Sequence, residues 1–229
     1  MNVKIIRLNT INSTNEYAKS VTSVGEDFVV WAKKQSAGKG TKGRTFSSKP
    51  GGVYVTLVRF FENLKTSDAF TIMQNVAVAV CETLLSFGVQ AKIKWPNDIY
   101  VGDKKICGIL IENAFNGENV RRSVIGIGLN VTNRLEKELL PIATTLYQET
   151  GKKFTVEEVG ATLIEKAFDD KGYTRYEQYL GWLGKEITLL QGEERIPCKL
   201  LGTDGRGNLL VEKDGEKRKF SAVEVSVRI

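Results

Sequence analysis

Short runs of alternating or β-branched apolar residues recur through the first 131 residues of the chain and predict strands. Seven segments fit this pattern: residues 3–8, 28–33, 53–60, 92–95, 99–101, 106–112 and 123–131. The pair Asp103-Lys104 carries a turn signal and is the expected tip of a hairpin between the fifth and sixth segments. Strands that follow one another this closely indicate a large β-sheet.

Helical periodicity appears between these strands and after them. The longest pattern covers residues 67–87, and its middle, residues 76–81, is apolar on all sides, so we expect a central helix packed against the sheet. Capping boxes of the Ser/Thr-x-x-Glu type predict helices that begin at Ser13 and Thr155, and a short aromatic helix is expected at residues 173–180. The pattern predicts an α+β fold in which a mixed β-sheet is packed by helices.

From about Gly184 the chain changes to short strands separated by glycine-containing turns. The segments 203–207 (TDGRG) and 213–215 (KDG) are strong turn signals. A segment of this length and pattern fits a small β-barrel. We therefore expect two domains, residues 1–183 and residues 184–229.

Composition excludes several classes of chemistry. The chain contains no histidine, which excludes Ser-His-Asp and Cys-His nucleophiles and most zinc sites. The three cysteines, Cys81, Cys107 and Cys198, follow no metal or disulfide spacing, and this usage suits a reducing compartment. Any chemistry must therefore use lysine, arginine, carboxylates and backbone amides, with Mg²⁺ as the candidate ion.

No apolar run approaches the ~18 residues that span a bilayer, and the N-terminus lacks the apolar core of a signal peptide. The sequence therefore predicts a cytoplasmic protein with no membrane partner. It carries no decisive signal for self-association, so a monomer and a homodimer both remain open.

Positive charge is concentrated in one stretch of the chain. The formal net charge is +6, but between Phe28 and Phe61 there are seven cations and no acid, so the remainder sums to −1. Within this stretch the segment 36–44 (SAGKGTKGR) has three glycines and three cations in nine residues. Glycines allow backbone N–H groups to turn toward an anion, so this loop predicts a site for phosphate or an acyl phosphate. It lacks the spacing of a P-loop, and a solvated basic hairpin tip is the alternative.

Four segments, taken in order, carry a family resemblance. They are Ser13-Thr14-Asn15, the loop 35–46, the run 94–98 (KWPND), and the segment 105–112 (KICGILIE) followed by 126–130 (GIGLN). Together they resemble the biotin protein ligase family, also called holocarboxylase synthetases. The KWPND run and the Lys-x-x-Gly-Ile-Leu segment are the specific signals. The resemblance covers essentially the whole chain and implies a class II synthetase-like catalytic domain with an SH3-like C-terminal domain. It also implies the monofunctional class, which lacks a DNA-binding domain.

The activity implied by this resemblance is a two-step acyl transfer. Biotin and Mg·ATP form biotinyl-5′-AMP, and a lysine of a biotin carboxyl carrier protein, or of the carrier domain of a carboxylase, then takes the biotin. A carboxylate that attacks a phosphate brings two anions together, so fixed cations and backbone amides lower the barrier. This chemistry requires no protein nucleophile, in agreement with a chain that has no histidine.

The resemblance also assigns site residues. The implied catalytic residues are Lys105, on the carboxylate and α-phosphate, and the loop cations Lys39 and Arg44. The implied biotin site consists of Ser13, Thr14, Asn15, Gln35, Gly38, Lys39, Lys105, Gly108 and Gly126. The implied ATP and adenylate site consists of Lys39, Arg44, Phe46, Lys94, Asn97, Asp98 and Asn130. No metal ligand is assigned, although Mg²⁺ would lie near Asp98.

Hydroxyl and amide side chains suit a neutral ureido group, which both donates and accepts hydrogen bonds. For Ser13 the alternative is a helix cap only, and Gly108 and Gly126 could simply mark bulges. Trp95 is expected in the core.

Two positions depart from the family pattern. Phe46 stands where the family usually has a tryptophan near the adenine, and an aromatic ring there can still stack. Thr41 stands where the family loop usually has an arginine, which removes a charge-assisted contact of roughly 1.5–3 kcal/mol. We expect weaker retention of biotinyl-5′-AMP, and a loop that closes over the adenylate when ligands bind.

Two other functions were weighed against this one. A lipoate or octanoate protein ligase shares the fold and the adenylate chemistry, but its usual Arg-Arg-x-Ser-Gly-Gly-Gly loop is absent from this sequence. A basic nucleic-acid-binding module could use the cationic stretch and the C-terminal barrel. However, residues 184–229 contain nearly equal numbers of cations and acids, so specific DNA binding is not expected.

Overall fold

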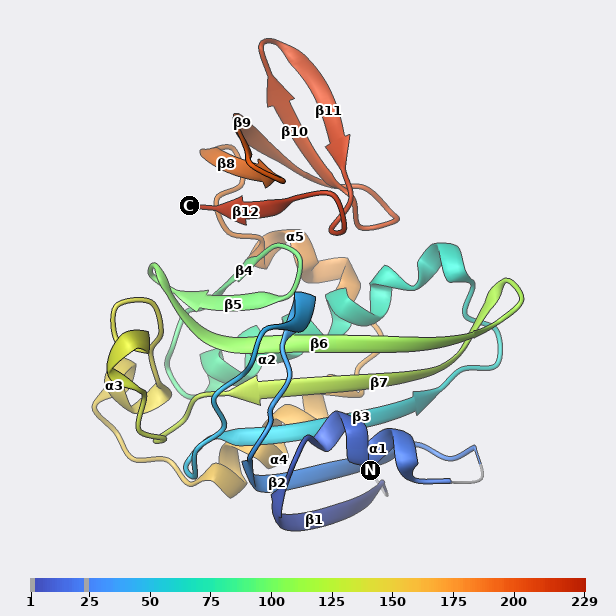
Figure 1. Cartoon of the computed structure of the whole chain (residues 1–229), viewed down its shortest axis with the longest axis vertical. Coiled ribbons are helices and arrows are strands. Elements are labelled where there is room, and N and C mark those ends of the chain that lie inside the picture. Colours follow the sequence, from blue (N-terminus) through green and yellow to red (C-terminus); the bar gives the residue numbers. More distant parts are fainter. Residues whose placement is uncertain (1–2, 23–24) are drawn as a thin grey trace.

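A computed structural model describes residues 3–22 and 25–229, and two β-sheets organise it (Figure 1). The larger sheet has seven strands in the order β1-β2-β3-β7-β6-β5-β4. These strands are β1 (Lys4–Ile11), β2 (Phe28–Gln35), β3 (Val53–Phe60), β4 (Lys92–Lys94), β5 (Asp98–Val101), β6 (Lys104–Asn116) and β7 (Asn119–Leu129). β1 and β2 pair in parallel and all other neighbours are antiparallel, so the predicted mixed sheet is confirmed.

The period-two alternation of the strands separates two hydrophobic clusters. Val29 and Trp31 of β2 point into the main core, which includes α2 (Phe70–Ser86) and α4 (Val156–Ala167). Phe28 and Val30 point to the opposite face, where they pack with Ala18 of α1 (Thr14–Ser20). The two long helices therefore cover one face of the sheet, and the other face is left for α1 and the loops beside it (Figure 1).

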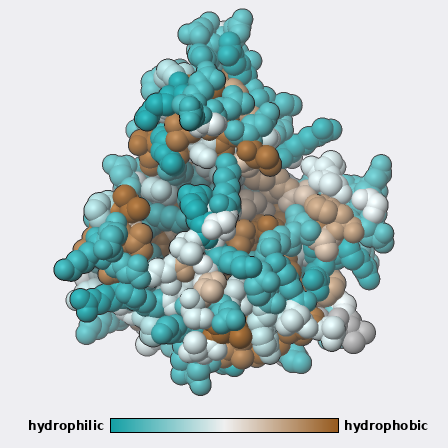
Figure 2. Space-filling model, in the orientation of Figure 1, coloured by the Kyte–Doolittle hydropathy of each residue, from teal (hydrophilic) through white to brown (hydrophobic). Residues whose placement is uncertain are grey.

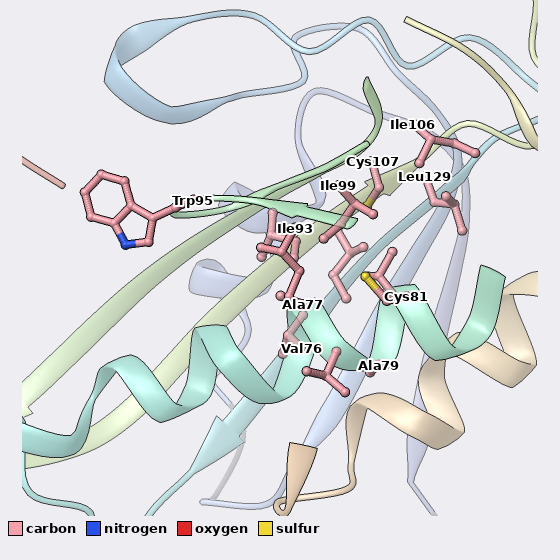
Figure 3. Packing of buried hydrophobic residues seen from close by; sticks show 14 of the residues in the cluster. Val76, Ala77, Ala79, Cys81, Ile93, Trp95, Ile99, Ile106, Cys107 and Leu129 are labelled. Carbon is pink, nitrogen blue, oxygen red and sulfur yellow. The ribbon is translucent and has the colours of Figure 1, made fainter. Parts of the chain in front are cut away.

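The central helix α2 forms as predicted in its apolar middle. Residues 76–81 are all buried, and the helix packs beneath Ile93, Ile99 and Cys107 of the sheet (Figure 3). The helical segment Thr66–Ser86 is apolar and long enough to cross a membrane by composition, but half of it is buried within the protein. Its apolar character is therefore accounted for by the core.

Several predicted boundaries were wrong. The predicted helix 67–87 starts later, because Thr66–Asp68 form a 3₁₀ turn whose Thr66 N–H donates to the Glu118 carbonyl of the β6–β7 turn. The predicted helix 173–180 is a 3₁₀ turn, Gly172–Arg175, followed by the single helical turn α5 (Tyr176–Tyr179).

One helix was not predicted, although its signal is present in the sequence. Helix α3 (Leu146–Thr150) begins with a capping box between Thr145 and Gln148, which is the same motif as at Thr155 with glutamine in place of glutamate.

The C-terminal segment forms a five-stranded antiparallel sheet in the order β11-β10-β9-β8-β12. Its strands are β8 (Glu186–Gln191), β9 (Glu194–Thr203), β10 (Leu209–Lys213), β11 (Glu216–Phe220) and β12 (Ser226–Arg228). Trp95 joins this sheet to the larger one, because its indole N–H donates to the Gly207 carbonyl at 3.0 Å in a buried contact. The expected core position of Trp95 is confirmed.

Candidate functional site

A cavity of about 590 Å³ lies on the sheet face that α2 and α4 leave uncovered. Strands β6 and β7 contribute to its lining, together with the start of α1, residues 39–41 and 44–47, and the C-terminal residues Arg228 and Ile229. A wider groove of about 1240 Å³ adjoins it and shares Arg44, Asp98 and Arg228 with it. Figure 2 shows a recess with apolar residues between the C-terminal sheet and the rest of the molecule.

Fourteen of the fifteen site residues predicted from the sequence line this cavity: Ser13, Thr14, Asn15, Gln35, Lys39, Arg44, Phe46, Lys94, Asn97, Asp98, Lys105, Gly108, Gly126 and Asn130. Gly38 is not part of this lining, and its predicted role in biotin binding stays a prediction. A side chain at Gly38 would collide with the Phe46 carbonyl and the Ser48 hydroxyl, so the glycine permits a close backbone crossing at the base of the basic loop.

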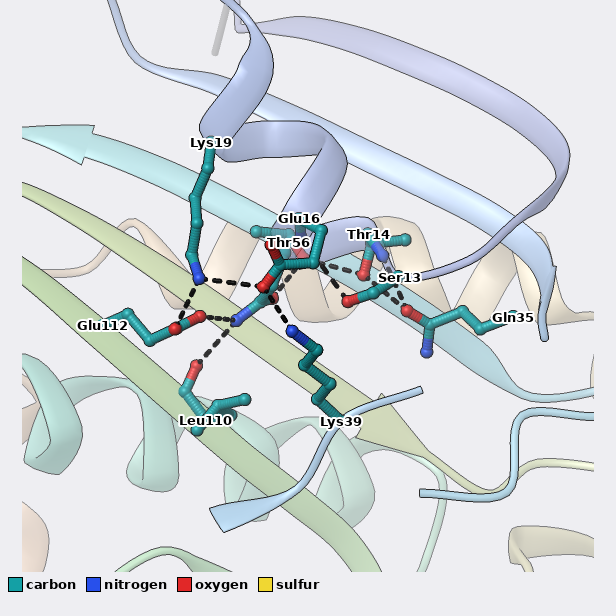
Figure 4. Close-up of polar contacts among 10 residues, drawn as sticks. Ser13, Thr14, Glu16, Lys19, Gln35, Lys39, Thr56, Leu110 and Glu112 are labelled. Atoms are coloured by element: carbon teal, nitrogen blue, oxygen red, sulfur yellow. Dashed lines mark hydrogen bonds and ion pairs between the residues drawn. The ribbon is translucent and has the colours of Figure 1, made fainter. Parts of the chain in front are cut away.

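One end of the cavity is built from neutral hydrogen-bonding groups (Figure 4). The Thr14 N–H donates to the Gln35 side-chain oxygen at 2.7 Å, and the hydroxyl groups of Thr14 and Thr56 lie 2.8 Å apart. The Thr56 hydroxyl also lies 2.7 Å from Asn15 Oδ1. Ser13 caps α1 by accepting from the Glu16 N–H, so its predicted cap role is present in a residue that also lines the cavity.

Lys94, Lys105 and Arg44 lie together at the other end, whereas Lys39 lies beside α1, near the neutral groups (Figure 4). Each of these cations is held by an oxygen of the protein. Lys105 Nζ lies 2.6 Å from Asp98 Oδ1, and Lys39 Nζ lies 2.8 Å from Glu16 Oε1. Arg44 donates from Nε to the Thr41 carbonyl and from Nη2 to its hydroxyl. The cationic groups are therefore already positioned, and an incoming anion must share or replace these partners.

Lys94 of the KWPND run carries a destabilised charge. Burial lowers the pKa of Lys94, and the neighbouring cations Arg228, Lys105 and Arg44 act in the same direction, while Asp98 opposes them. Its ammonium group lies 3.4 Å from the Tyr100 hydroxyl. This environment favours a bound anion, which would lower the electrostatic cost of the charge.

Three glycines in the strands under the cavity leave space that side chains would fill. A side chain at Gly126 would collide with the Asn15 amide, and one at Gly128 would collide with the Phe46 ring. A Cβ atom on Gly108 would lie 3.0 Å from Lys105 Nζ. Gly126 therefore lies under the neutral groups, whereas Gly108 and Gly128 lie under Lys105 and the Phe46 ring.

The three predicted nucleotide residues Phe46, Asn97 and Asn130 have partners within the protein. The Phe46 ring packs edge-to-face on Tyr54, with ring centroids 6.5 Å apart. The Asn97 amide donates to the Ile109 carbonyl at 2.8 Å, and the Asn130 amide donates to the Thr144 carbonyl at 3.1 Å. The two asparagines therefore hold the cavity walls together, which leaves their side chains fewer free donors for a ligand.

The lining residues that the sequence did not predict include two groups outside the family motifs. Leu135, Leu139 and Ile142 come from the irregular segment between β7 and α3, where no periodic pattern marks them. Arg228 and Ile229 come from the end of the chain and approach the site through β12.

The basic loop also contacts this end of the chain. Lys42 Nζ donates to the Val225 carbonyl at 3.3 Å and to the Ser226 hydroxyl at 3.2 Å. The C-terminal sheet and the loop therefore form adjoining walls of one site.

A magnesium ion has few protein ligands available. Within residues 3–22 and 25–229, no group of three or more Cys, Asp or Glu side chains is arranged to hold a metal. Asp98, the predicted neighbour, is paired with Lys105. Mg²⁺ commonly binds one or two carboxylates together with substrate phosphates, so this site fits an ion that arrives with ATP.

The cavity thus combines neutral donors and acceptors at one end with cations at the other, as required by a ligand with a neutral polar head and an anionic tail. The profile of the biotin/lipoate A/B protein ligase family matches residues 8–130, and the chain belongs to this family.

Among similar proteins, the bifunctional ligase/repressor BirA of Bacillus spizizenii is 33% identical over 97% of this chain and 74% of its own length. The biotin–[acetyl-CoA-carboxylase] ligase of Paracoccus denitrificans is 33% identical over 93% of this chain and 96% of its own length. A solved structure, the biotin protein ligase of Aquifex aeolicus in complex with biotin and ATP, superimposes with a TM-score of 0.81, 28% identity and 98% coverage of both chains.

Proposed function

We propose that this chain is an ATP-dependent biotin protein ligase that forms biotinyl-5′-AMP and transfers biotin to a lysine of a biotin carboxyl carrier domain. The observation that carries this proposal is the division of a single cavity into a neutral hydrogen-bonding end and a cationic end. Biotin has a ureido group that both donates and accepts hydrogen bonds, at the opposite end of the molecule from its carboxylate. The Paracoccus relative is a biotin–[acetyl-CoA-carboxylase] ligase, and the Aquifex structure is a biotin protein ligase in complex with biotin and ATP.

The first step joins the biotin carboxylate to the α-phosphorus of ATP, and pyrophosphate leaves with the electron pair of the broken P–O bond. We assign Lys105, Lys39 and Arg44 to hold these anions, because all three line the cavity, with Lys105 and Arg44 at its cationic end and Lys39 on the loop that closes it beside α1. Fixed cations stabilise the negative charge that develops in such a transfer without any reorganisation during the reaction. Mg²⁺ would accompany the ATP phosphates near Asp98 and supply further positive charge.

In the second step the acceptor lysine amine attacks the acyl carbon, the amine loses a proton and AMP leaves. We assign the neutral end to biotin and the end near Phe46, Lys94, Asn97, Asp98 and Asn130 to the nucleotide. The carrier domain has to reach the reactive acyl group from outside the cavity. The adjoining groove, with its shared Arg44 and Asp98, offers a route for that approach.

We also propose a catalytic domain of residues 1–183 and a C-terminal domain of residues 184–229. The second sheet, which starts at Glu186, supports this division. A cytoplasmic location fits the three free, buried cysteines. Both a monomer and a homodimer remain compatible with the proposal.

A lipoate ligase is the rival of the same fold. The dithiolane ring of lipoate carries no hydrogen-bond donors, so the buried polar groups of Thr14, Asn15 and Thr56 would remain partly unsatisfied against it. Nucleic-acid binding by the basic loop is not favoured, because its cations Lys39 and Arg44 line the cavity and do not form an open basic surface.

Isothermal titration with biotin and with lipoic acid, each with and without a non-hydrolysable ATP analogue, tests the proposal. We expect selective binding of biotin, tightened by the nucleotide. Binding of lipoic acid alone would assign the site to the rival ligase, and no binding of either acid would refute the proposed function.

A further inference from the structure

Glu112 lies beside the neutral end of the cavity and was not among the predicted site residues. It is on β6, and its Oε2 accepts from Asn15 Nδ2 at 3.0 Å. Its other oxygen, Oε1, lies 2.5 Å from Lys19 Nζ of α1. The pair Asn15–Glu112 joins residues that are 97 positions apart in the sequence. Figure 4 shows Glu112 together with its ion-pair partner Lys19.

The carboxylate determines which way the Asn15 amide points. A side-chain amide can turn by 180° and exchange its donor and acceptor ends. In the reversed orientation Asn15 Oδ1 would face the carboxylate of Glu112 and the carbonyl of Leu110, both of which only accept. The observed orientation places Nδ2 between these acceptors and leaves Oδ1 facing Thr56 at 2.7 Å.

The opposite end of the same network is fixed by the backbone. The Thr14 N–H can only donate, and it donates to Gln35 Oε1 at 2.7 Å, while Gln35 Nε2 donates to the Ser48 hydroxyl at 2.8 Å. The Gln35 amide therefore also presents its oxygen to the network. Two amide oxygens, those of Asn15 and Gln35, thus stand at the two ends.

Between these oxygens, two hydroxyl groups make three contacts. The Thr14 hydroxyl lies 3.0 Å from Gln35 Oε1 and 2.8 Å from the Thr56 hydroxyl, which lies 2.7 Å from Asn15 Oδ1. Each of the three contacts needs one proton, but the two hydroxyl groups supply only two. One oxygen in the network is therefore left without a hydrogen bond from a hydroxyl group. The network is therefore matched to a ligand that brings an N–H or O–H donor.

We propose that Glu112 is a positioning residue, which holds Asn15 in the orientation that makes this end of the cavity accept a hydrogen bond from the ligand. The proposal rests on the proposed function, because it names the biotin ureido N–H as the donor. Lys19 places the carboxylate through their ion pair, and Glu16 contacts both Lys19 and the loop residue Lys39.

The ion pair has an electrostatic signature at Lys19. The pKa of Lys19 is raised: burial acts to lower it, and the hydrogen bonds to Glu112 and Glu16 outweigh that effect. Lys19 therefore stays charged beside the carboxylate throughout the physiological pH range. In this arrangement one oxygen of Glu112 accepts a hydrogen bond from Asn15, and the other forms the ion pair with Lys19.

The test is a double-mutant cycle on the full chain, read by titration calorimetry with biotin. Glu112→Gln can present either an oxygen or an NH₂ group to Asn15, so both amide orientations become possible, and we expect the biotin Kd to rise about tenfold. In an Asn15→Ala background the same substitution should change the Kd less than about twofold. The KM for ATP and the thermal midpoint should stay close to wild type.

Two control variants separate orientation from other effects. Glu118→Gln makes the same chemical change at an exposed residue on the β6–β7 turn and should leave the biotin Kd unchanged. Lys19→Met removes the ion pair but leaves the accepting oxygens of Glu112, so it should weaken biotin less than Glu112→Gln does.

Additive effects of Asn15→Ala and Glu112→Gln would overturn the proposal. So would an effect of Lys19→Met as large as that of Glu112→Gln, because the charge and not the amide orientation would then be responsible. If the wild-type protein failed to bind biotin, the proposed function itself would be wrong. If the wild-type protein bound biotin and Glu112→Gln had no effect on the Kd, only the role of Glu112 would be wrong.

Discussion

Lys105 and Asp98 form an ion pair of 2.6 Å at the centre of the cationic end. The two residues belong to the two specific sequence motifs, and their strands β5 and β6 are neighbours in the sheet. The Lys105 ammonium also lies 6.0 Å from the centre of the Phe46 ring. The pair thus holds the lysine between the strand floor and the basic loop, where an incoming phosphate would compete with Asp98.

Replacement of Lys105 by alanine should abolish most of the first reaction step. The developing charge at the α-phosphate would lose its fixed cation, so we expect biotinyl-5′-AMP formation to fall by about 10²–10³-fold. Pyrophosphate release measures this step. The matched control is Lys104→Ala, which removes an exposed lysine at the adjacent position. A Lys105→Ala enzyme with near wild-type adenylate formation would contradict the assignment.

Two glycines of β7 should separate the biotin and ATP parts of the site. Neither Gly126 nor Gly128 has a positive φ angle, so alanine fits the backbone and acts through its side chain alone. Gly126→Ala would push on the Asn15 amide, and Gly128→Ala would push on the Phe46 ring. We expect the first variant to raise the KM for biotin and the second to raise the KM for ATP, each by about tenfold.

Each of these variants serves as the control for the other. Steady-state kinetics with one substrate varied at a time measures both KM values. The division of the cavity would be wrong if both variants raised the two KM values equally.

Lys94→Met should stabilise the fold and weaken ATP binding. Burial lowers the pKa of Lys94 in the folded protein, so the charged form is less favourable there than in the unfolded chain. This penalty is fully present at pH values below the folded pKa, falls as the pH rises through it and is gone above the ordinary lysine pKa of 10.5. The variant should therefore have a higher thermal midpoint than wild type at pH 7, and the difference should shrink as the pH approaches 10.

Thermal unfolding at several pH values measures this difference, and ATP titration measures the functional effect. Lys92→Met is a matched control, because Lys92 is on the same strand, β4. Its ammonium group lies 3.9 Å from the centre of the Trp182 ring and does not line the cavity. A pH-independent difference for Lys94→Met would show that the lysine charge is not the cause.

Local sequence signals predicted much of the fold. The helix caps and the β-branched strands depend on neighbours within a few residues. The structure contains the full capping box at Thr155 and the Ser13 cap, although the Glu16 side chain pairs with Lys19 and Lys39 and does not complete a box at Ser13. Most of the site residues that the family motifs predicted also line the cavity. The backbone crossing at Gly38 could not be predicted, because a glycine that allows such a crossing has the same sequence pattern as one that faces a ligand.

The remaining site residues depend on long-range packing. Glu112 meets Asn15 across 97 positions, and Arg228 reaches the cavity only because β12 pairs with β8 in the second sheet. Such neighbours are set by the register of strands and by the contact of two sheets. A single sequence carries no local signal for them.

Thr41 should make this enzyme release its adenylate more easily than a variant with arginine at this position. The Thr41 hydroxyl now accepts a hydrogen bond from Arg44 Nη2 at 3.1 Å, so it binds a neighbouring cation and adds no charge of its own. Thr41→Arg would add a cation on the loop that lines the cavity. We expect release of biotinyl-5′-AMP to slow by about tenfold, because a charge-assisted contact contributes about 1.5–3 kcal/mol.

The comparison needs a variant that alters Thr41 without adding charge. Thr41→Val removes the hydroxyl and keeps a similar volume, so it should release the adenylate at least as fast as wild type. Dissociation of radiolabelled biotinyl-5′-AMP measures the rates, and biotin attached to lysines of a bystander protein reports the released intermediate. Slower release from Thr41→Arg should reduce bystander labelling while carrier labelling continues. Equal dissociation rates for wild type and Thr41→Arg would show that Thr41 has no influence on retention of the intermediate.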